Sequence, residues 1–368
     1  MQTVEVDLPK NGYTIIAGSG LFKDTLPIRH LADAASGRSC LIVTDSNVGP
    51  LYERPLTEAL RQAGAASISV ATIAAGESSK TLSTMESLYE HALDAGLNRT
   101  SVVLGLGGGV VGDLAGFLAA TYMRGIACVQ VPTSLLAMVD SSVGGKTGVD
   151  LPRGKNLVGA FHQPSLVLAD VSCLSTLPAR ELACGLAEVA KYAFIMAPEF
   201  HQELSERAEA LNRLEPSAVE SIVRQCCELK TKIVIEDERE RGRRALLNYG
   251  HTFGHALESR GGYAAYRHGE AVAIGMGMAA DLSVRLSLAS PDLPRQQDEL
   301  LKRLHLPIRW QLADTNASAI IEIMRSDKKM RSAALRLVLC RKIGQAVVED
   351  VTDETAVAQA IEGRREPA

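Results

Sequence analysis

Residues 102–113 read VVLGLGGGVVGD and decide the fold of the first half of the chain. A short apolar run leads into three consecutive glycines, Gly107, Gly108 and Gly109, and then into a segment with helical periodicity. Glycines let backbone amides approach a diphosphate closely at a helix N-terminus, where the helix dipole favours negative charge. The stretch predicts a strand, a glycine turn and a helix that bind a dinucleotide. Because the spacing is not G-x-G-x-x-G, a plain tight turn stays an alternative.

Other β-rich runs surround this stretch, at residues 40–44, 67–70, 128–131 and 166–168, and a helical pattern covers 81–95. Alternation of this kind is typical of a Rossmann-like α/β domain with a parallel sheet, whose ligands bind at the carboxyl ends of the strands. Asp45 and Asn47 follow the first of these runs and are suited to a ribose hydroxyl, although both are also ordinary turn residues.

After residue 178 the β-rich runs nearly vanish, and helical periodicity covers residues 181–192, 198–211, 218–234 and 268–286. The chain of 368 residues also exceeds what one hydrophobic core usually serves. We therefore expect two domains, a nucleotide-binding α/β domain over 1–178 and a mostly α-helical, metal-binding domain over 179–368. The final GRREPA reads as a frayed tail.

The net charge of -4 and the pI of about 6.1 give no basic field for nucleic acid. The N-terminal segment alternates like a first strand, and no run resembles a secretion signal or a membrane span. Seven scattered cysteines without a C-x-x-C pair read as small core residues in a reducing compartment. These features favour a cytoplasmic protein with neither a nucleic-acid nor a membrane partner.

Lys146 lies in Val-Gly-Gly-Lys-Thr, residues 143–147, which resembles part of a phosphate-binding P-loop. The P-loop interpretation fails because Asp140 stands where the motif needs its first glycine. With Lys155 and Asn156 close behind, a glycine-rich loop that presents ammonium and amide donors to a phosphate or carboxylate fits better. A solvated loop without a ligand is the alternative.

Three of the eight histidines fall between residues 251 and 268. His251 and His255, four residues apart, share one face of a helix, and His268 follows, so a catalytic metal site is one interpretation and ordinary polar histidines are another. Glu188 lies in the small, apolar helix GLAEVAKY, where a carboxylate is costly unless it is paired or bound to a cation. It is the preferred third ligand, although Glu188 and Lys191 also suit a simple helix pair.

Five segments, taken in order, resemble the 3-dehydroquinate synthase family: GGGVVGDLAGFLAATYMRG (107–125), VPTSLLAMVDSSVGGKTGVDLPRGKNLVGAFHQP (131–164), GLAEVAKY (185–192), LLNYGHTFGHALE (246–258) and HGEAVAIGM (268–276). The resemblance covers about residues 40 to 345. It implies NAD and zinc, with cobalt possible, as cofactors and usually a homodimer. Its fold is shared with iron-type polyol dehydrogenases.

The resemblance also implies site residues. NAD contacts are implied at Asp45, Asn47, Glu77, Lys80, Gly107, Gly108, Gly109, Asp113, Thr133 and Ser134, with Lys146, Lys155 and Thr176 nearby. Metal ligands are implied at Glu188, His251 and His268. Substrate-binding and catalytic positions are implied at Arg124, Asp140, Lys146, Asn156, Lys191, Lys230, Arg244, Asn248 and His255. The stretch 327–329, Asp-Lys-Lys, resembles a further substrate lysine site.

The implied substrate is a phosphorylated seven-carbon sugar acid, 3-deoxy-D-arabino-heptulosonate 7-phosphate. Transient oxidation by NAD, phosphate elimination, re-reduction and an intramolecular aldol closure would convert it to 3-dehydroquinate. Another sugar-phosphate cyclase is the nearest alternative. A polyol dehydrogenase suits the lysines less well, and a regulatory module with a structural metal would need four ligands rather than three.

Overall fold

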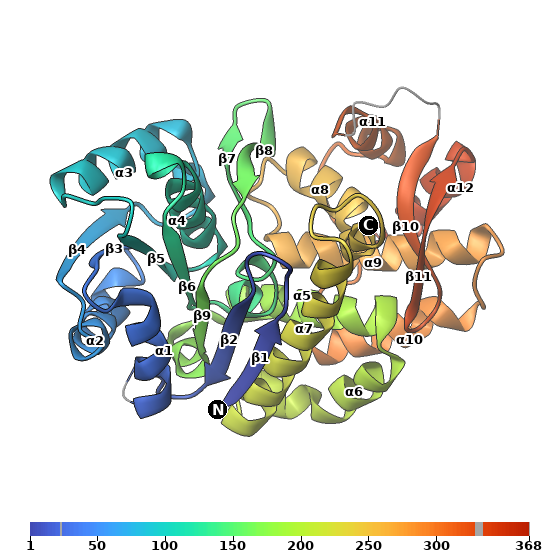
Figure 1. The fold of residues 1–368 in the computed structure, drawn as a ribbon. Coiled ribbons are helices and arrows are strands. Elements are labelled where there is room, and N and C mark those ends of the chain that lie inside the picture. The colour runs from blue at the N-terminus through green and yellow to red at the C-terminus, as the bar shows by residue number, and fades with distance from the viewer. Residues whose placement is uncertain (23, 328–333, 368) are drawn as a thin grey trace. The chain divides into compact units, whose positions relative to one another are not determined.

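The structure is a computed structural model that describes residues 1–22, 24–327 and 334–367. The chain forms two compact units (Figure 1). Unit 1 comprises Met1–Leu177 with Val219–Arg239, and unit 2 comprises Pro178–Ala218 with Glu240–Ala368. From the sequence we expected one continuous second domain over residues 179–368. In the structure, residues 219–239 instead pack with unit 1.

Unit 1 holds a sheet, a two-stranded ribbon and the helices around them. Its strands are β1 (Gln2–Val6), β2 (Tyr13–Gly18), β3 (Ser39–Asp45), β4 (Ser67–Ile73), β5 (Val102–Gly107), β6 (Ala127–Pro132), β7 (Lys146–Leu151), β8 (Gly154–Phe161) and β9 (Leu166–Asp170). Its helices are α1 (Thr25–Ala35), α2 (Gly49–Gln62), α3 (Leu82–Asp94) and α4 (Gly109–Thr121), together with most of α7 (Pro216–Glu236).

The main sheet has the strand order β1-β2-β9-β6-β5-β3-β4, and only the β1–β2 pair is antiparallel. The central strands are continuous apolar runs, as expected for parallel strands covered on both faces. Leu114 and Leu118 of α4 join Leu41 of β3 and Val103 of β5 in one buried core. The Rossmann-like α/β fold predicted for this part of the chain is confirmed.

The strand order places a topological switch between β3 and β5. From β3 the chain moves outward to β4, whereas from β5 it moves to β6 on the other side. In open parallel sheets, ligands bind outside the carboxyl ends of the strands at such a point. The glycine turn after β5 and Asp45 at the end of β3 flank it.

Residues 146–161 differ from the loop that the sequence predicts. They form an antiparallel ribbon of β7 and β8 in which Gly148 pairs with Gly159. A Cβ at Gly159 would overlap the carbonyl of Thr147, so glycine allows the two strands to approach. Glycine lowers strand propensity in sequence, which is why this pairing was not predicted.

Unit 2 is mostly helical, as predicted, and its helices are α5 (Ala179–Met196), α6 (Pro198–Asn212), α8 (His251–Arg260), α9 (His268–Arg285), α10 (Asp292–Arg303), α11 (Ala317–Asp327) and α12 (Glu354–Glu362). It also contains an antiparallel strand pair that was not predicted, β10 (Leu335–Lys342) and β11 (Gln345–Val351). In the part of the chain that the structure describes, no helix combines the length and apolarity needed to span a membrane.

The expected frayed tail is instead anchored up to Glu366, and Arg364 supplies its side-chain contacts. This side chain is only 4% exposed and donates to both carboxylate oxygens of Asp281, at 2.6 and 3.0 Å, and to Asp298 at 2.5 Å. The backbone of Trp310 exchanges hydrogen bonds with Arg364 and Glu366. A polar segment at a chain end can therefore be buried when each charge finds a partner.

Glycines at the contacts between the helices α5, α8 and α9 allow their backbones to pack closely. A Cβ at Gly275 of α9 would overlap the carbonyl of Gly250 at the start of α8, and one at Gly254 would lie 3.0 Å from backbone atoms of Ala271. A Cβ at Gly269 of α9 would overlap the backbone of Cys184 in α5. Backbone atoms cannot rotate away as side chains can, so these contacts fix the helix spacing.

We predict that Gly275→Ala destabilises the protein by about 1–3 kcal/mol through overpacking, although alanine is the better helix former. The control is Gly49→Ala in α2, where the atoms nearest to an added Cβ belong to the side chains of Thr44 and Glu53. Urea unfolding in the presence of chelator measures both variants without a contribution from bound metal. Equal midpoints for the two variants would refute the packing argument.

Candidate functional site

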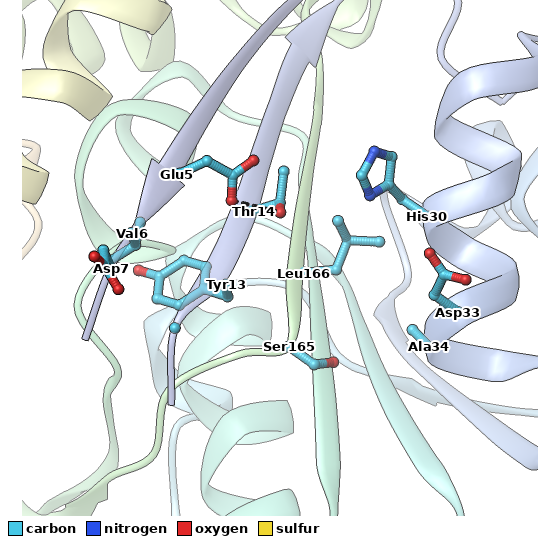
Figure 2. Close-up of a pocket in the computed structure, with 11 residues that line it drawn as sticks. Glu5, Val6, Asp7, Tyr13, Thr14, His30, Asp33, Ala34, Ser165 and Leu166 are labelled. Atoms are coloured by element: carbon cyan, nitrogen blue, oxygen red, sulfur yellow. Dashed lines mark hydrogen bonds between the residues drawn. The ribbon is translucent and has the colours of Figure 1, made fainter. Parts of the chain in front are cut away.

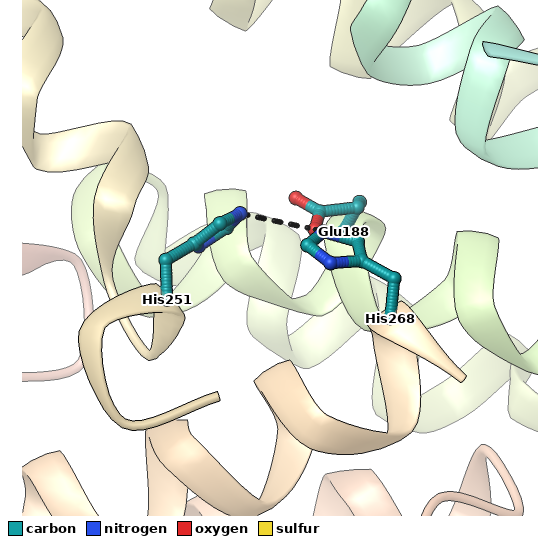
Figure 3. A group of neighbouring side chains, drawn as sticks. All are labelled: Glu188, His251 and His268. Atoms are coloured by element: carbon teal, nitrogen blue, oxygen red, sulfur yellow. Dashed lines mark ion pairs between the residues drawn. The ribbon is translucent and has the colours of Figure 1, made fainter. Parts of the chain in front are cut away.

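Three helices of unit 2 bring Glu188, His251 and His268 together. Glu188 lies in the middle of α5, while His251 and His268 are the first residues of α8 and α9. The Nε2 atoms of both histidines lie 3.5 Å from Glu188 Oε1, and one ligand atom from each residue falls within 4.8 Å of the others (Figure 3). The predicted metal ligands thus converge, although 80 residues separate the first from the last.

The donor set fits a divalent cation. Glu188 is fully buried, and its neighbours on α5 are almost all apolar, so its negative charge needs positive charge nearby. Lys191, 1% exposed, supplies part of it through an ion pair with Glu188 Oε2. Two imidazoles and one carboxylate form a common set of protein ligands for catalytic zinc, and the set also accepts cobalt, iron or manganese.

The two histidines differ in their second ring nitrogens. His251 Nδ1 lies 3.1 Å from the carbonyl of Tyr249, whereas His268 Nδ1 lies 3.2 Å from Glu258 Oε2. Burial lowers the pKa of His251 to about 3. Burial opposes charge on His268 too, but hydrogen bonds to Glu188 and Glu258 raise its pKa to about 10. A metal ion would therefore have to displace a proton from His268 but not from His251.

The remaining predicted residues of unit 2 lie close to these helices. His255 is exposed on α8, with ring centroids 5.5 Å from His251 and 5.8 Å from His268. Arg244, 1% exposed, and Asn248 belong to the short helix η5 (Arg243–Asn248), which packs against α5. Asn248 donates to Glu240 at 2.8 Å.

Glu258, which was not predicted from the sequence, is 4% exposed and contacts a predicted metal ligand. Its spacing offered a signal, since it follows His251 by seven residues and His255 by three and so shares their helix face. The further substrate lysine site suggested at 327–329 cannot be located, because Lys328 and Lys329 lie outside the described residues.

In unit 1, the residues predicted to contact NAD follow five neighbouring parallel strands. They lie after β9, β6, β5, β3 and β4, which is the spatial order of the strands in the sheet. The residues are Thr176 after β9, Thr133 and Ser134 after β6, Gly107, Gly108, Gly109 and Asp113 after β5, Asp45 and Asn47 after β3, and Glu77 and Lys80 after β4. One edge of one sheet therefore gathers them.

The glycine turn has the geometry expected of a close-approach site. Gly107 ends β5 and Gly109 begins α4, so the first amides of α4 face the sheet edge. A Cβ at Gly107 would lie 2.6 Å from Val111 Cγ2, which excludes larger residues there. A Cβ at Gly108 would meet only Ser134 Oγ, at 3.5 Å, so glycine is not required there for packing.

Asp45 and Thr176 have local partners. Asp45 Oδ1 accepts hydrogen bonds from the backbone amides of Asn47 and Val48, at 2.8 and 3.0 Å, which is the ordinary turn role considered as the alternative. The second carboxylate oxygen and the exposed side chain of Asn47 lie at the end of β3. Thr176 shares a hydrogen bond of 2.7 Å with the hydroxyl of Tyr52.

A polar cluster joins the β4 end to the ribbon. Lys80 Nζ donates to Asp113 Oδ2 and to Asn156 Oδ1, both at 2.5 Å, and Lys155 Nζ lies 3.3 Å from Glu77. Burial opposes the charge of Lys80, but Asp113 holds its pKa above the usual value. Asp150, which was not predicted from the sequence, also belongs to the cluster, and its carboxylate accepts a hydrogen bond from the backbone amide of Asn156 at 2.8 Å. The ribbon thus carries two predicted substrate or cofactor residues to the sheet edge.

Three other predicted residues of unit 1 are Asp140, Lys146 and Lys230. Lys230 of α7 donates to the carbonyl of Asp140 at 2.5 Å and pairs with its carboxylate, so these two predicted residues meet. Asp140 belongs to a π-helical turn, Ala137–Ser141, a geometry frequent at functional sites. Lys146 is exposed at the start of β7.

Arg124 is not brought to the same edge. It is exposed in η2 (Tyr122–Arg124), at the C-terminal end of α4, whereas the glycine turn lies at the N-terminal end. At 1.5 Å per residue, α4 separates the two by roughly 20 Å. The chain then enters β6 at Ala127, at the amino end of the strand.

Unit 1 also contains a cavity of about 500 Å³ that none of these predicted residues lines (Figure 2). It is lined by β1, β2, the start of β9 and α1, and its side chains include Glu5, Asp7, His30 and Asp33. Glu5 accepts a hydrogen bond of 2.9 Å from Thr14. Three carboxylates make this cavity unsuitable for an anionic phosphate ester.

Two family models and a curated relative that match this chain carry the same description. The family model described as 3-dehydroquinate synthase N-terminal matches residues 70–184, and the model described as 3-dehydroquinate synthase C-terminal matches residues 185–330. A 3-dehydroquinate synthase from Nitrosococcus oceani is 46% identical over 363 residues, which is 98% of this chain and 99% of that protein.

Two solved structures share the fold. A 2-epi-5-epi-valiolone synthase from Streptomyces hygroscopicus, with NAD+ and Zn2+ bound, has a TM-score of 0.87 at 28% identity and covers 97% of this chain and 98% of its own. A 2-deoxy-scyllo-inosose synthase, complexed with carbaglucose-6-phosphate, NAD+ and Co2+, has a TM-score of 0.88 at 26% identity. The match covers 99% of this chain and 100% of that chain. Since the family models and the curated relative span both units, this chain belongs to the 3-dehydroquinate synthase family.

Proposed function

We propose that this protein is a 3-dehydroquinate synthase that converts 3-deoxy-D-arabino-heptulosonate 7-phosphate to 3-dehydroquinate and phosphate, with NAD and a divalent metal ion as cofactors. Family membership supports the reaction. Within the structure, the observation that carries the proposal is the fully buried carboxylate of Glu188. The Nε2 atoms of His251 and His268 both lie 3.5 Å from its Oε1 atom. A buried carboxylate facing two imidazoles suits a cation better than it suits a packed core.

Unit 1 would bind the dinucleotide. NAD, when bound, supplies a hydride acceptor that is regenerated within the cycle, so no NADH accumulates. The backbone amides at the start of α4 would hold its diphosphate, and Asp45 and Asn47 would hold a ribose hydroxyl. Lys80, held by Asp113, would keep its positive charge at the sheet edge while buried.

Unit 2 would bind the metal through Glu188, His251 and His268. Zinc there supplies a Lewis acid for the reacting hydroxyl and the ketone formed from it. Three protein ligands leave coordination positions for the substrate, as in catalytic rather than structural zinc sites. Lys191, paired with Glu188, would place an ammonium group next to the bound oxygens.

The phosphate needs cationic and amide donors, and Lys155, Asn156, Lys191 and Arg124 are the proposed set. Of these four residues, Arg124 lies at the C-terminal end of α4, opposite the glycine turn. The exposed imidazole of His255 and the ammonium of Lys146 are proposed to hold or pass protons. Asp140, Lys230, Arg244 and Asn248 would orient hydroxyl and carboxylate groups of the substrate.

A cyclitol-forming synthase is the second candidate, because both solved structures described above are of that kind. It would keep the NAD and metal residues and change those that contact the substrate. The combination of Arg244, Asn248 and His255 favours the dehydroquinate branch. A polyol dehydrogenase would instead produce NADH in proportion to turnover.

We further expect a homodimer in the cytoplasm. The family resemblance suggests the dimer. All seven cysteines are free and buried, which suits a reducing compartment. Light scattering on the purified protein tests the oligomeric state.

Purified protein given NAD, zinc and 3-deoxy-D-arabino-heptulosonate 7-phosphate should release phosphate without net absorbance from NADH, because the hydride returns to the substrate. Chelator should abolish release, and added zinc or cobalt should restore it. Glucose 6-phosphate is the control substrate. Release from glucose 6-phosphate alone would assign the chain to the cyclitol-forming branch, and net NADH would assign it to the dehydrogenases.

Glu188→Gln should weaken zinc binding by at least about 100-fold, since losing a ligand exceeds the effect of losing a neighbour of a ligand. The single variant also leaves Lys191 buried without its carboxylate, so its stability in chelator should fall. The double variant Glu188→Gln/Lys191→Met should regain that stability while zinc binding stays weak. Zinc competition against a chromophoric chelator and urea unfolding give the two readouts. Wild-type zinc affinity in either variant would remove Glu188 from the ligand set.

Gly108→Val should weaken NAD binding by at least about 10-fold, because the side chain fills the space where backbone amides would meet the diphosphate. Gly108→Ala should lie between wild type and Val, since its Cβ meets only Ser134 Oγ at 3.5 Å. Calorimetric titration with NAD measures the affinities. Unchanged affinity in Gly108→Val, in a protein of normal stability, would contradict a phosphate site at this turn.

A further inference from the structure

Glu258 is a buried carboxylate that the proposed chemistry leaves without a role. It lies on α8, two turns after His251, and is 4% exposed. A carboxylate at this depth is costly unless a donor compensates for the lost water. Its Oε2 atom lies 3.2 Å from Nδ1 of His268, at hydrogen-bonding distance.

His268 is thereby placed between two carboxylates, one at each ring nitrogen. Its Nδ1 faces Glu258, and its Nε2 lies 3.5 Å from Glu188 Oε1. A neutral imidazole carries one N–H. If Glu258 accepts that hydrogen, the Nε2 lone pair is directed towards Glu188 and His251.

His251 shows the same arrangement with a different acceptor. Its Nδ1 faces the carbonyl of Tyr249 at 3.1 Å, and its Nε2 lies 3.5 Å from the same oxygen of Glu188. A backbone carbonyl preceding the helix orients one ring, whereas the other ring, at the start of α9, is oriented by a side chain from α8. Only the second of these partners can be removed by substitution.

We propose that Glu258 is a positioning residue, which accepts the Nδ1 hydrogen of His268, fixes its tautomer and holds its Nε2 towards the metal ion. The proposal rests on the metal site of the proposed function but not on the identity of the substrate. In metal sites, an acceptor at the second ring nitrogen of a ligating histidine raises its basicity and fixes its orientation.

Glu258 as a direct metal ligand is the competing arrangement. Glu258, His255 and His268 also form a group whose ligand atoms lie within 4.8 Å of one another. Such a site would use Nδ1 of His268, whereas the Glu188 site uses Nε2. A neutral imidazole offers one lone pair, so the two sites exclude each other. The fully buried Glu188 and the lower exposure of His251, compared with the exposed His255, favour the Glu188 site.

The test compares Glu258→Ala with Glu258→Gln in zinc affinity, measured by competition with a chromophoric chelator. Glu258→Ala should bind zinc about 10- to 100-fold more weakly than wild type. Glu258→Gln should retain most of the affinity, because its amide oxygen can still accept the Nδ1 hydrogen. The visible absorption of the cobalt-loaded proteins should change in Glu258→Ala and resemble wild type in Glu258→Gln.

Glu181→Ala is the matched control. Glu181 is a carboxylate on α5, two turns before Glu188, that pairs with Arg267 at 3.2 Å instead of with an imidazole. Zinc affinity in this variant should stay within about twofold of wild type, since exposed pairs contribute little. Urea unfolding in chelator shows separately whether each apo variant is folded.

Wild-type zinc affinity in folded Glu258→Ala would overturn the proposal, and so would equal losses in the Ala and Gln variants. Loss of zinc binding in Glu258→Gln together with wild-type binding in Glu188→Gln would instead establish the competing site. The proposed reaction fails separately: a protein that binds zinc as expected but releases no phosphate contradicts the function and leaves the role of Glu258 intact.

Discussion

The close packing of α5, α8 and α9 at glycines is the constraint on which the convergence of Glu188, His251 and His268, the proposed metal ligands, depends. Gly250 immediately precedes His251, and Gly269 immediately follows His268. A Cβ at Gly250 would lie 2.7 Å from the carbonyl of Val272, and a Cβ at Gly269 would overlap Cys184, one turn before Glu188. The residues that let the helices approach are therefore sequence neighbours of the ligands. Any change in helix spacing acts directly on the distances between the ligand atoms.

A different constraint gathers the predicted dinucleotide residues of unit 1. Parallel strands end at one edge of a sheet, so residues distant in sequence become neighbours without individual contacts to hold them. The β7–β8 ribbon adds Lys155 and Asn156 to that edge through Lys80 and Glu77. The backbone topology alone brings these residues to one end of the sheet. A turn residue such as Asp45 can therefore accept a hydrogen bond from its own turn and still lie where a ligand would bind.

The structure could be predicted from the sequence where a local pattern determines it, and could not be predicted where it depends on partners that are distant in the sequence. Alternating apolar runs predicted the parallel strands, and Glu188, His251 and His268 were proposed as metal ligands because their motifs resemble those of the family. The β7–β8 and β10–β11 pairs were missed, because glycine-rich or isolated runs form strands only once a partner is present. Glu258 and Arg364 were missed for the same reason: each looks like an ordinary surface charge until its partner across the fold is known.

Buried charges in unit 2 link stability to function. Replacing a buried ion pair by apolar residues is often neutral or stabilising, so the pair of Glu188 and Lys191 is poorly explained by stability alone. Three carboxylate and ammonium groups, Glu188, Lys191 and Glu258, lie at 4% exposure or less around His251 and His268. Binding of a cation to the folded state alone would offset the cost of burying the two carboxylates and raise stability with metal concentration. The same burial that makes these carboxylates costly in an apo protein strengthens their interaction with a bound ion, because little water remains to screen it.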